Sequence, residues 1–437
     1  MKKRFCILLC FLLALSLCGC SVVSIDFENL AQSPRFTIEQ TQIYEALLES
    51  TGKNINLKYP KTGDYRSAFI ISDFDGNGDS EALVLYQMQS ASNDSVVRAT
   101  LLDESSQGMW SARHDIAGGG TDVEKVTVTE SEQGSIFITV GYSSLNIDEK
   151  ILHVYIVRNG GLFLVASDHY SVMETIDIDN SGYEDLIAIR KSAESDGYEA
   201  CLYEFGEKNL THTSVTPMAY DSVSYTGYTK GFISEDIPAL YVESTTSNAQ
   251  QATEIIYYIN GALVNPMAGI VGGDLFAKTG RIIGYNCADI DEDTIPEIPI
   301  MKVLPGYEES ENPLYFTTWC SFKPNIGLVE KYAGYCSNKG SFHLTFPSRW
   351  KDEVTITYNS ANDEFVFYKY EGQIKDNMTE IMRIVFVSKT QTAEYIHDGF
   401  EILGEKGQTD YLLKLSVDRR EPLIPTFDEI ENNFYIL

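Results

Sequence analysis

From residue 65 onward, short apolar runs alternate with small groups of Gly, Asn, Asp and Ser. The runs are rich in β-branched and aromatic residues, which is typical of antiparallel strands joined by turns. The first four fall within roughly fifty residues, about the length of one four-stranded propeller blade. They are Ser67–Ser72, Ala82–Gln87, Val96–Leu102 and Met109–Ile116. This pattern predicts one sheet of four strands in sequence order.

A polar stretch of nine residues, Asp73–Glu81, joins the first two of these strands. Side-chain oxygens stand at its positions 1, 3, 5 and 9, and a glycine at position 6 permits a sharp turn. Asp177–Asp185 and Asp289–Glu297 repeat the oxygen spacing. The side chains concerned are Asp73, Asp75, Asn77, Glu81, Asp177, Asp179, Ser181, Asp185, Asp289, Asp291, Asp293 and Glu297. A hard cation such as calcium binds about six to eight oxygens, and alternate residues of a short loop supply them.

Asp, Asn and Gly are also common turn residues, so one such loop alone would not indicate a metal. Three loops with the same oxygen spacing do indicate one, because acids held this close repel one another without a cation. The sequence therefore predicts calcium ions that stabilise these loops.

The three loops begin 104 and 112 residues apart, which is about twice the length of one blade. We therefore predict that a blade without calcium ligands lies between each pair of loops. Apolar runs with the expected rhythm occur at residues 125–166 and again at residues 222–266. The predicted fold is an all-β propeller of about five blades at residues 65–336.

A capping box at residues 37–40, followed by apolar residues at helical spacing, predicts a helix at Ile38–Thr51. At the start of the chain, basic residues 2–4 precede an apolar run, Phe5–Leu17. This run is typical of a secretion signal and is too short to span a membrane.

The apolar run ends in Leu17-Cys18-Gly19-Cys20, which resembles the lipobox of bacterial lipoproteins. The resemblance implies that residues 1–19 are a signal peptide and that Cys20 becomes acylated. Residues 20–64 would then hold the lipid anchor, a tether and the helix, on the extracytoplasmic face of a bacterial membrane. An ordinary cleaved signal with a chance cysteine is the alternative.

The three acidic loops with their flanking strands resemble the calcium loops of FG-GAP/VCBS repeats. Those repeats form β-propeller blades in integrin α chains and in many bacterial surface proteins. The resemblance implies that backbone carbonyls complete the calcium shells, at Asp79, Tyr183 and Ile295. The third loop departs from the pattern, with Thr294 where the others have glycine, and a β-branched residue resists positive φ. Two to three structural calcium sites are therefore expected.

After residue 336 the pattern changes to strands of alternating polarity with aromatic residues between them. We interpret residues 337–437 as a separate small α+β or β-rich domain, with Trp350 as its core anchor. Four cysteines lie outside the N-terminal segment, at 201, 287, 320 and 336, and none forms a Cys-x-x-Cys pair. Cys320 and Cys336 flank a predicted hairpin, so they are either a disulfide or two buried thiols.

The formal net charge is −30, which repels phosphate backbones and makes nucleic acid a poor partner. The six histidines form no His-Glu-x-x-His motif, and no Gly-x-Ser-x-Gly motif occurs. No catalytic constellation is therefore evident. We expect a membrane-anchored binding or adhesion protein for an envelope protein or glycan. An envelope hydrolase or lyase that uses the propeller as a scaffold is the alternative, and a purely structural role is a third.

Overall fold

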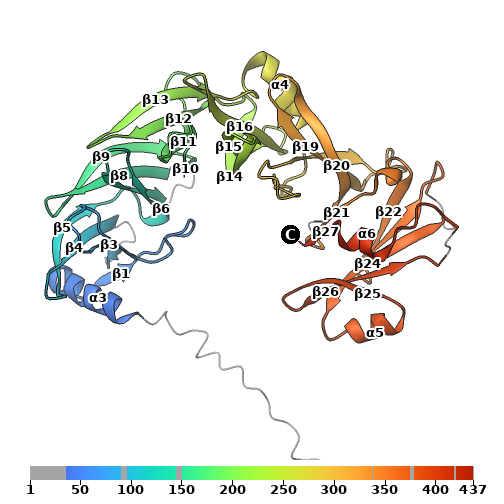
Figure 1. Ribbon diagram of the computed structural model, residues 1–437, viewed down its shortest axis with the longest axis horizontal. Helices are drawn as coiled ribbons and strands as arrows, with labels where there is room; N and C mark the ends of the chain where they lie inside the picture. Colours follow the sequence, from blue (N-terminus) through green and yellow to red (C-terminus); the bar gives the residue numbers. More distant parts are fainter. Residues whose placement is uncertain are drawn as a thin grey trace, which may run out of the picture.

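The computed structural model describes residues 36–89, 96–143, 150–337, 339–374, 378–417 and 420–436. The predicted signal peptide and the predicted anchor, Cys20, lie outside these residues. The described strands form six antiparallel sheets that follow one another along the chain. Figure 1 shows them arranged in an arc, from the first sheet in blue to the sixth in red.

The first sheet has the strand order β1-β3-β4-β5, with β2 also paired to β3. Its strands are β1 (Ile55–Leu57), β2 (Phe69–Ser72), β3 (Glu81–Met88), β4 (Val97–Glu104) and β5 (Trp110–Ala117). Because β1 pairs with residues 86–88 and β2 with residues 81–84, the two strands share one edge of the sheet. The intervening segment leaves this edge and pairs with the second sheet, through a parallel bridge from Thr62 to Lys125.

The second, third and fourth sheets each contain four strands in sequence order. The second is β6 (Asp122–Glu130), β7 (Ile136–Ser143), β8 (Lys150–Arg158) and β9 (Gly161–Tyr170). The third is β10 (Val172–Ile176), β11 (Asp185–Lys191), β12 (Tyr198–Phe205) and β13 (Leu210–Pro217). The fourth is β14 (Ser222–Ser234), β15 (Ile237–Thr246), β16 (Gln251–Ile259) and β17 (Ala262–Val264). The prediction of blades without acidic loops at residues 125–166 and 222–266 is confirmed.

The fifth sheet takes its strands from two distant parts of the chain. It has the order β18-β19-β20-β21-β27, and it follows helix α4 (Gly269–Lys278). Its strands are β18 (Ile298–Val303), β19 (Tyr315–Lys323), β20 (Gly327–Ser337), β21 (Phe342–Thr345) and β27 (Phe434–Ile436). The last strand therefore returns the C-terminal segment to the fifth sheet.

The sixth sheet has the order β22-β23-β24-β26-β25. Its strands are β22 (Val354–Asn359), β23 (Glu364–Lys369), β24 (Glu380–Ser388), β25 (Glu401–Lys406) and β26 (Thr409–Leu415). Three short helical segments accompany it: η1 (Ser348–Trp350), α5 (Thr392–His397) and α6 (Phe427–Glu431). Trp350 is buried, and its indole N–H donates to the carbonyl of Leu423 at 2.7 Å, so it is a core residue as predicted.

The predicted boundary between residues 336 and 337 is wrong, because it passes through the fifth sheet. β21 and β27 both lie beyond it, yet β21 pairs with β20 and β27 pairs with β21. The fifth and sixth sheets also share one buried core that includes Leu344, Phe342 and Phe367. Residues 337–437 are therefore the outer edge of one blade and the whole of the next, not a separate domain.

Consecutive sheets pack face to face, and a buried apolar cluster fills each of the five interfaces. Between the first two sheets, for example, Leu83 of β3 and Ile138 of β7 belong to the same cluster. The middle strands are consequently buried on both faces, which explains why they are continuously apolar instead of alternating. The face-to-face packing of consecutive sheets arranges them in an arc.

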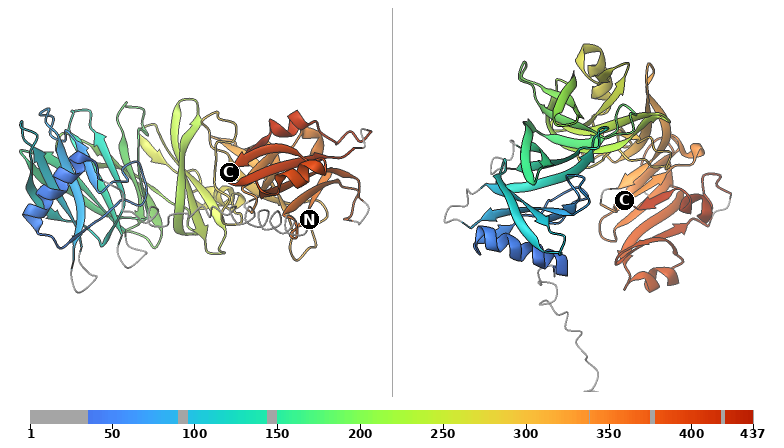
Figure 2. Two further views of the ribbon diagram at one scale, coloured as in Figure 1. Left: turned by 90° about the horizontal axis from the view of Figure 1, so that it is seen from below. Right: turned by 60° about the vertical axis from the view of Figure 1, so that its left-hand side comes forward.

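The two ends of the arc stay apart in all three ribbon views (Figures 1 and 2). A helix covers the outer face at each end. α3 (Ile38–Thr51) begins with the predicted capping box and packs Ile43 and Leu47 on the first sheet. At the other end, Tyr395 of α5 packs on buried residues of the sixth sheet. Because both terminal faces are covered, neither needs the other to bury its apolar side chains.

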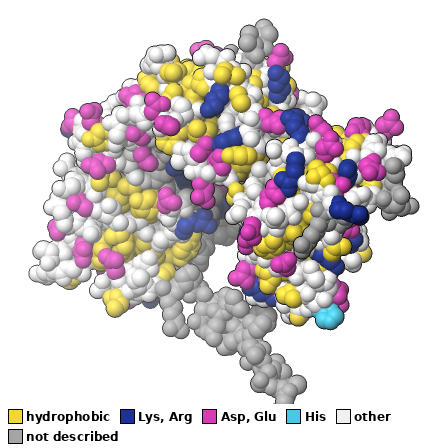
Figure 3. All heavy atoms as spheres, turned by 45° about the vertical axis from the view of Figure 1, so that its right-hand side comes forward, with side chains coloured by type: hydrophobic (Ala, Val, Ile, Leu, Met, Phe, Trp, Pro, Cys, Tyr) yellow, Lys and Arg dark blue, Asp and Glu magenta, His cyan; other side chains and the backbone are white. Residues whose placement is uncertain are grey.

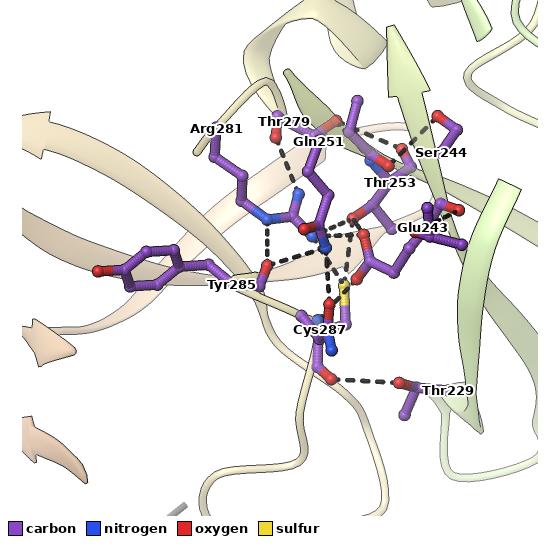
Figure 4. A network of polar contacts seen from close by, with 12 residues as sticks. Thr229, Glu243, Ser244, Gln251, Thr253, Thr279, Arg281, Tyr285 and Cys287 are labelled. Atoms are coloured by element: carbon purple, nitrogen blue, oxygen red, sulfur yellow. Dashed lines mark hydrogen bonds and ion pairs between the residues drawn. The ribbon is translucent and has the colours of Figure 1, made fainter. Parts of the chain in front are cut away.

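A buried polar network joins the fourth sheet to the segment that leads into the fifth (Figure 4). The guanidinium of Arg281 is fully buried and lies 2.5 Å from Glu243 Oε2. It also donates to the carbonyls of Thr279 and Tyr285, and Glu243 Oε1 accepts from the N–H of Cys287 at 2.7 Å. An ion pair this buried is costly unless its remaining hydrogen bonds are made, and here they are. The network therefore holds the segment that leads into the fifth sheet against the fourth sheet.

The cysteines at 201, 287, 320 and 336 are free and buried. The disulfide interpretation of Cys320 and Cys336 is wrong, and two buried thiols is the alternative that holds. In the β19–β20 hairpin Cys320 lies opposite Glu330, whereas Cys336 pairs outward with His343 of β21. Six residues of strand, about 20 Å, separate Glu330 from Cys336, which is far beyond the reach of a disulfide.

Within the described part of the chain, no helix has the length and apolar character needed to cross a bilayer.

Candidate functional site

The three acidic loops occupy equivalent places in the first, third and fifth sheets. The first joins β2 to β3, and the second joins β10 to β11. The third precedes β18 and is closed by an antiparallel bridge between Ala288 and Glu297. In each loop the carboxylates at positions 1, 3 and 9 bring one oxygen apiece to within 4.8 Å of one another. The sequence prediction of three acidic clusters is therefore confirmed.

The backbone of each loop wraps around the carboxylate at position 1. In the second loop, Asp177 Oδ1 accepts from the N–H of Ser181 at 2.9 Å and Oδ2 accepts from the N–H of Gly182 at 2.9 Å. The same pair of bonds occurs at Asp73 in the first loop and at Asp289 in the third. These bonds fix the turn and direct the side chains of the loop towards one centre.

Position 6 has positive φ in all three loops, at 93° for Gly78, 90° for Gly182 and 72° for Thr294. Thr294 therefore adopts the conformation that its side chain disfavours, and the third loop keeps the path of the other two. The departure seen in the sequence strains the loop without altering its geometry.

The predicted ligands at positions 5 and 7 also lie in these loops. In each loop the side chain at position 5 accepts a hydrogen bond from the backbone N–H at position 7. Asn77 accepts from Asp79 at 2.7 Å, Ser181 from Tyr183 at 3.3 Å and Asp293 from Ile295 at 2.9 Å. The carbonyl of Tyr183 lies 3.4 Å from Ser181 Oγ, so it is close to the cluster. That these carbonyls bind a metal remains a prediction.

The carboxylates at position 9 show where a cation fits. Glu81, Asp185 and Glu297 are all buried, with exposed fractions of 2%, 5% and 0%. Glu81 Oε2 accepts from the N–H of Phe74 at 2.7 Å. Glu81 Oε1 and Asp185 Oδ2, in contrast, are buried without a hydrogen-bond partner. An unpaired buried carboxylate oxygen is costly, and a cation among the three carboxylates would satisfy it.

The electrostatics of the first two loops agree with this geometry. Burial raises the pKa of Glu81 to about 7, and the nearby Asp75 and Asp73 add to the effect. Burial also raises the pKa of Asp185 to about 7, with a further contribution from Asp179. Each carboxylate is thus disfavoured in its charged form unless a positive charge is present. Oxygen-only donors with two carboxylates near a third suit a hard divalent cation.

The third loop already contains a positive charge. Lys331 from β20 places its Nζ 2.7 Å from Asp291 Oδ2, 2.5 Å from Asp293 Oδ2 and 3.0 Å from Glu297 Oε1. The hydroxyl of Tyr332 donates to Asp291 Oδ2 at 2.7 Å. Burial opposes the charge on Lys331, but its hydrogen bonds to Asp291, Asp293 and Glu297 raise its pKa above the ordinary lysine value. The buried carboxylate of the third loop is therefore partnered.

A β-bulge brings Lys331 to this position. In the β19–β20 ladder Trp319 lies opposite Tyr332 and Cys320 lies opposite Glu330, so Lys331 is an extra residue. A bulge re-aims side chains, and here two consecutive residues, Lys331 and Tyr332, both reach the loop. Sequence reasoning missed both, since they lie 34 to 41 residues from the carboxylates that they contact. Nothing in the nine residues of the loop signals a partner so distant along the chain.

Among the described residues, the clusters of His, Cys, Asp and Glu that could hold a metal are these three, and none includes a His or a Cys. The buried Cys287 has a pKa well above the ordinary thiol value, because burial disfavours the thiolate. It is therefore a poor nucleophile.

No protein-family model matches this chain, and a search of curated proteins finds no match. Solved structures give distant likenesses. A protein from Lactobacillus plantarum has 12% identity and a TM-score of 0.32, covering 74% of this chain and 85% of the other. A rhamnogalacturonan lyase from Bacillus licheniformis has 8% identity and a TM-score of 0.31, covering 74% and 76%. At these scores neither likeness carries an argument, and the propeller-like fold rests on the sheets themselves.

Proposed function

We propose that this chain is an extracytoplasmic binding protein whose arc of sheets is stabilised by two calcium ions, in the first and second acidic loops. The observation that carries the calcium sites is the pair of buried, unpartnered oxygens, Glu81 Oε1 and Asp185 Oδ2. Each stands in a cluster with two further carboxylates, which supplies the hard oxygen ligands that calcium prefers.

The third loop takes no calcium in this proposal, because Lys331 supplies its charge. An ammonium in contact with Asp291, Asp293 and Glu297 occupies the centre that a cation would use. The expected stoichiometry is therefore two calcium ions per chain, although three loops carry the spacing.

Each calcium would join the two strands that its loop connects. The loop carboxylates come from both ends of the turn, so a bound ion closes the hairpin and cancels the repulsion between them. Extracellular calcium is plentiful, so sites with a Kd of about 10⁻⁴ to 10⁻³ M would be occupied.

Isothermal titration calorimetry of the purified mature chain with calcium tests this part of the proposal. We expect two sites per chain, and a melting temperature that rises with calcium because the ion binds only the folded loops. Three sites would contradict the role given to Lys331, and no binding at millimolar calcium would contradict the calcium sites altogether.

We further propose that Cys20 anchors the chain by a lipid, and that the arc binds a protein or glycan of the cell envelope without catalysis. The lipobox-like sequence before Cys20 supports the anchor, and the absence of a recognised catalytic motif supports a binding role. Cys20→Ser should abolish metabolic labelling with palmitate, whereas persistent label would contradict the anchor. A pull-down against envelope glycans and proteins, run beside a turnover assay on the same glycans, would separate a binder from a hydrolase or lyase.

A further inference from the structure

A groove of about 430 Å³ lies where the third and fourth sheets meet, on the side of the arc opposite the acidic loops. Ser171 lines the groove just before β10, and the second acidic loop begins at Asp177 just after β10. The five residues of β10 (Val172–Ile176) span about 17 Å, which keeps the two features apart. The groove is therefore independent of the calcium loops.

The groove is basic in a chain that is strongly acidic. Asp and Glu total 63 against 33 Lys and Arg, yet the groove is lined by Lys150 and Lys191 and by no carboxylate. Within the described residues, neither lysine has a salt-bridge partner, although Lys150 Nζ lies 5.8 Å from the centroid of the Tyr170 ring and its charge helps to lower the pKa of Glu124. Figure 3 shows acidic side chains spread widely over the surface, with Lys and Arg side chains beside the hollow of the molecule. Two lysines without a salt-bridge partner would attract an anionic ligand to this side.

Three tyrosines give the groove fixed aromatic walls. Tyr198 and Tyr225 pack edge to face with ring centroids 5.0 Å apart. The hydroxyl of Tyr198 donates to the carbonyl of Val223 at 3.1 Å, and that of Tyr225 donates to Glu254 Oε1 at 3.0 Å. Tyr170 is buried and its hydroxyl has no hydrogen-bond partner. Rings held in this way offer apolar surface at little cost in side-chain entropy.

The groove continues on both sides. A cavity of about 300 Å³ shares Lys150, Tyr170, Ser171 and Lys191 with it and adds His169 and the ion pair of Asp168 with Arg190. A second cavity of about 300 Å³ shares Lys150, Tyr170, Ser171 and Tyr225 and runs along the innermost strands β6, β10 and β14. Its one carboxylate, Glu124, is paired with Lys61. The combined depression is elongated, which suits a chain-like ligand more than a compact one.

We propose that this groove binds a polysaccharide that contains uronic acids, an inference that rests on the binding role proposed above. The carboxylates of the sugars would pair with Lys150 and Lys191. The apolar faces of the sugar rings would pack on Tyr198 and Tyr225, and ring hydroxyls would hydrogen-bond with Ser171.

Single charges spaced along a sugar chain suit the groove better than the concentrated charge of a phosphate group. The planar fork of an arginine binds two oxygens of a carboxylate or a phosphate at once, whereas a lysine offers one point of positive charge. The arginine beside the groove, Arg190, is already held by Asp168 at 2.5 Å and by Glu199 at 3.0 Å. The free cations are two lysines on different sheets, which suits single charges spaced along a polymer.

Calorimetry of the calcium-loaded mature chain with hyaluronan oligosaccharides tests the proposal, since these alternate uronic acid with a neutral sugar. Chitin oligosaccharides of equal length are the neutral control, and a glycerol-phosphate polymer is the phosphate control. We expect binding to hyaluronan alone. Lys150→Gln and Lys191→Gln should each weaken it about tenfold, and the double variant about a hundredfold. Tyr198→Ala should also weaken it about tenfold.

The matched control is Lys53→Gln combined with Lys208→Gln, which changes the net charge equally but away from the groove. All variants should keep the calcium stoichiometry and melting temperature of the parent chain. Equal binding of the neutral sugar, tighter binding of the phosphate polymer, or equal effects of the control variant would each overturn the proposal. If the chain binds some other envelope component that the groove variants do not affect, the binding role stands and this assignment of the groove fails.

Discussion

The second and third acidic loops differ in whether a residue from outside the loop, Lys331, supplies positive charge. Both loops hold a carboxylate at position 1 with the same two backbone N–H groups, and both bury a carboxylate at position 9. In the second loop an oxygen of Asp185 has no partner, whereas in the third Glu297 contacts the ammonium of Lys331. A repeated loop can therefore satisfy the same charge demand with an ion from solution or with its own lysine.

The difference also shows why the number of loop motifs in a sequence need not equal the number of bound ions. A clustered set of carboxylates fixes the need for positive charge, but not its source. A lysine at the centre loses side-chain conformational entropy when the chain folds, and the loop then needs no calcium from solution. The following predictions change one side of this comparison at a time.

The largest effect is expected for Lys331→Met in calcium-free buffer. Removing Lys331 leaves the fully buried Glu297 carboxylate uncompensated, which should lower the free energy of unfolding by about 3 kcal/mol, the lower end for a buried pair because Lys331 itself is partly exposed. Calcium should then restore much of this loss and calorimetry should count three ions in place of two. Lys339→Met, at an exposed lysine beside Asp363, is the control and should change little. A Lys331 variant that still binds two ions would contradict the proposed exchange.

Removal of calcium from the parent chain should have the next largest effect. At calcium about tenfold above Kd, each site contributes roughly 1.4 kcal/mol, or about 3 kcal/mol for two sites. Chemical denaturation with calcium and with chelator measures the difference. If chelation leaves the unfolding curve unchanged, the first two loops are not calcium sites.

The paired variants Asp177→Asn and Asp289→Asn compare the two loops directly. Asp177→Asn should remove one calcium ion and about 1.4 kcal/mol of calcium-dependent stability. Asp289→Asn should leave the calcium stoichiometry unchanged, because its loop binds Lys331 instead. Calorimetry of both variants is the measurement, and an equal loss of calcium in the two would mean that the loops are equivalent.

The smallest effect concerns the backbone of the third loop. Thr294 has a φ of 72°, so Thr294→Gly should relieve strain and stabilise the chain by about 1 kcal/mol. Thr357→Gly, in the extended strand β22, is the matched control and should destabilise it. A destabilised Thr294 variant would show that this position carries no strain.

Much of the fold is predictable from local pattern. The alternation of apolar runs and turn residues located most strands of the first, second and fourth sheets, and the loop spacing placed two blades that carry no acidic loop. The boundary at residue 336 failed because β27 returns from the C-terminus to pair with β21, and no local pattern shows which edge a late strand will join. The groove was missed for the same reason, since Lys150, Lys191 and Tyr198 come from three strands.

The sequence by itself determined the acidic loops, since a fixed spacing of oxygens and positive-φ positions over nine residues is a local property of the chain. Tertiary structure alone decided which loops need an ion. Lys331 follows the third loop by more than thirty residues and reaches it only because a bulge in the β19–β20 ladder turns it inward. Contacts between strands depend on register, and register is set by packing against neighbouring sheets and not by the residues of the loop.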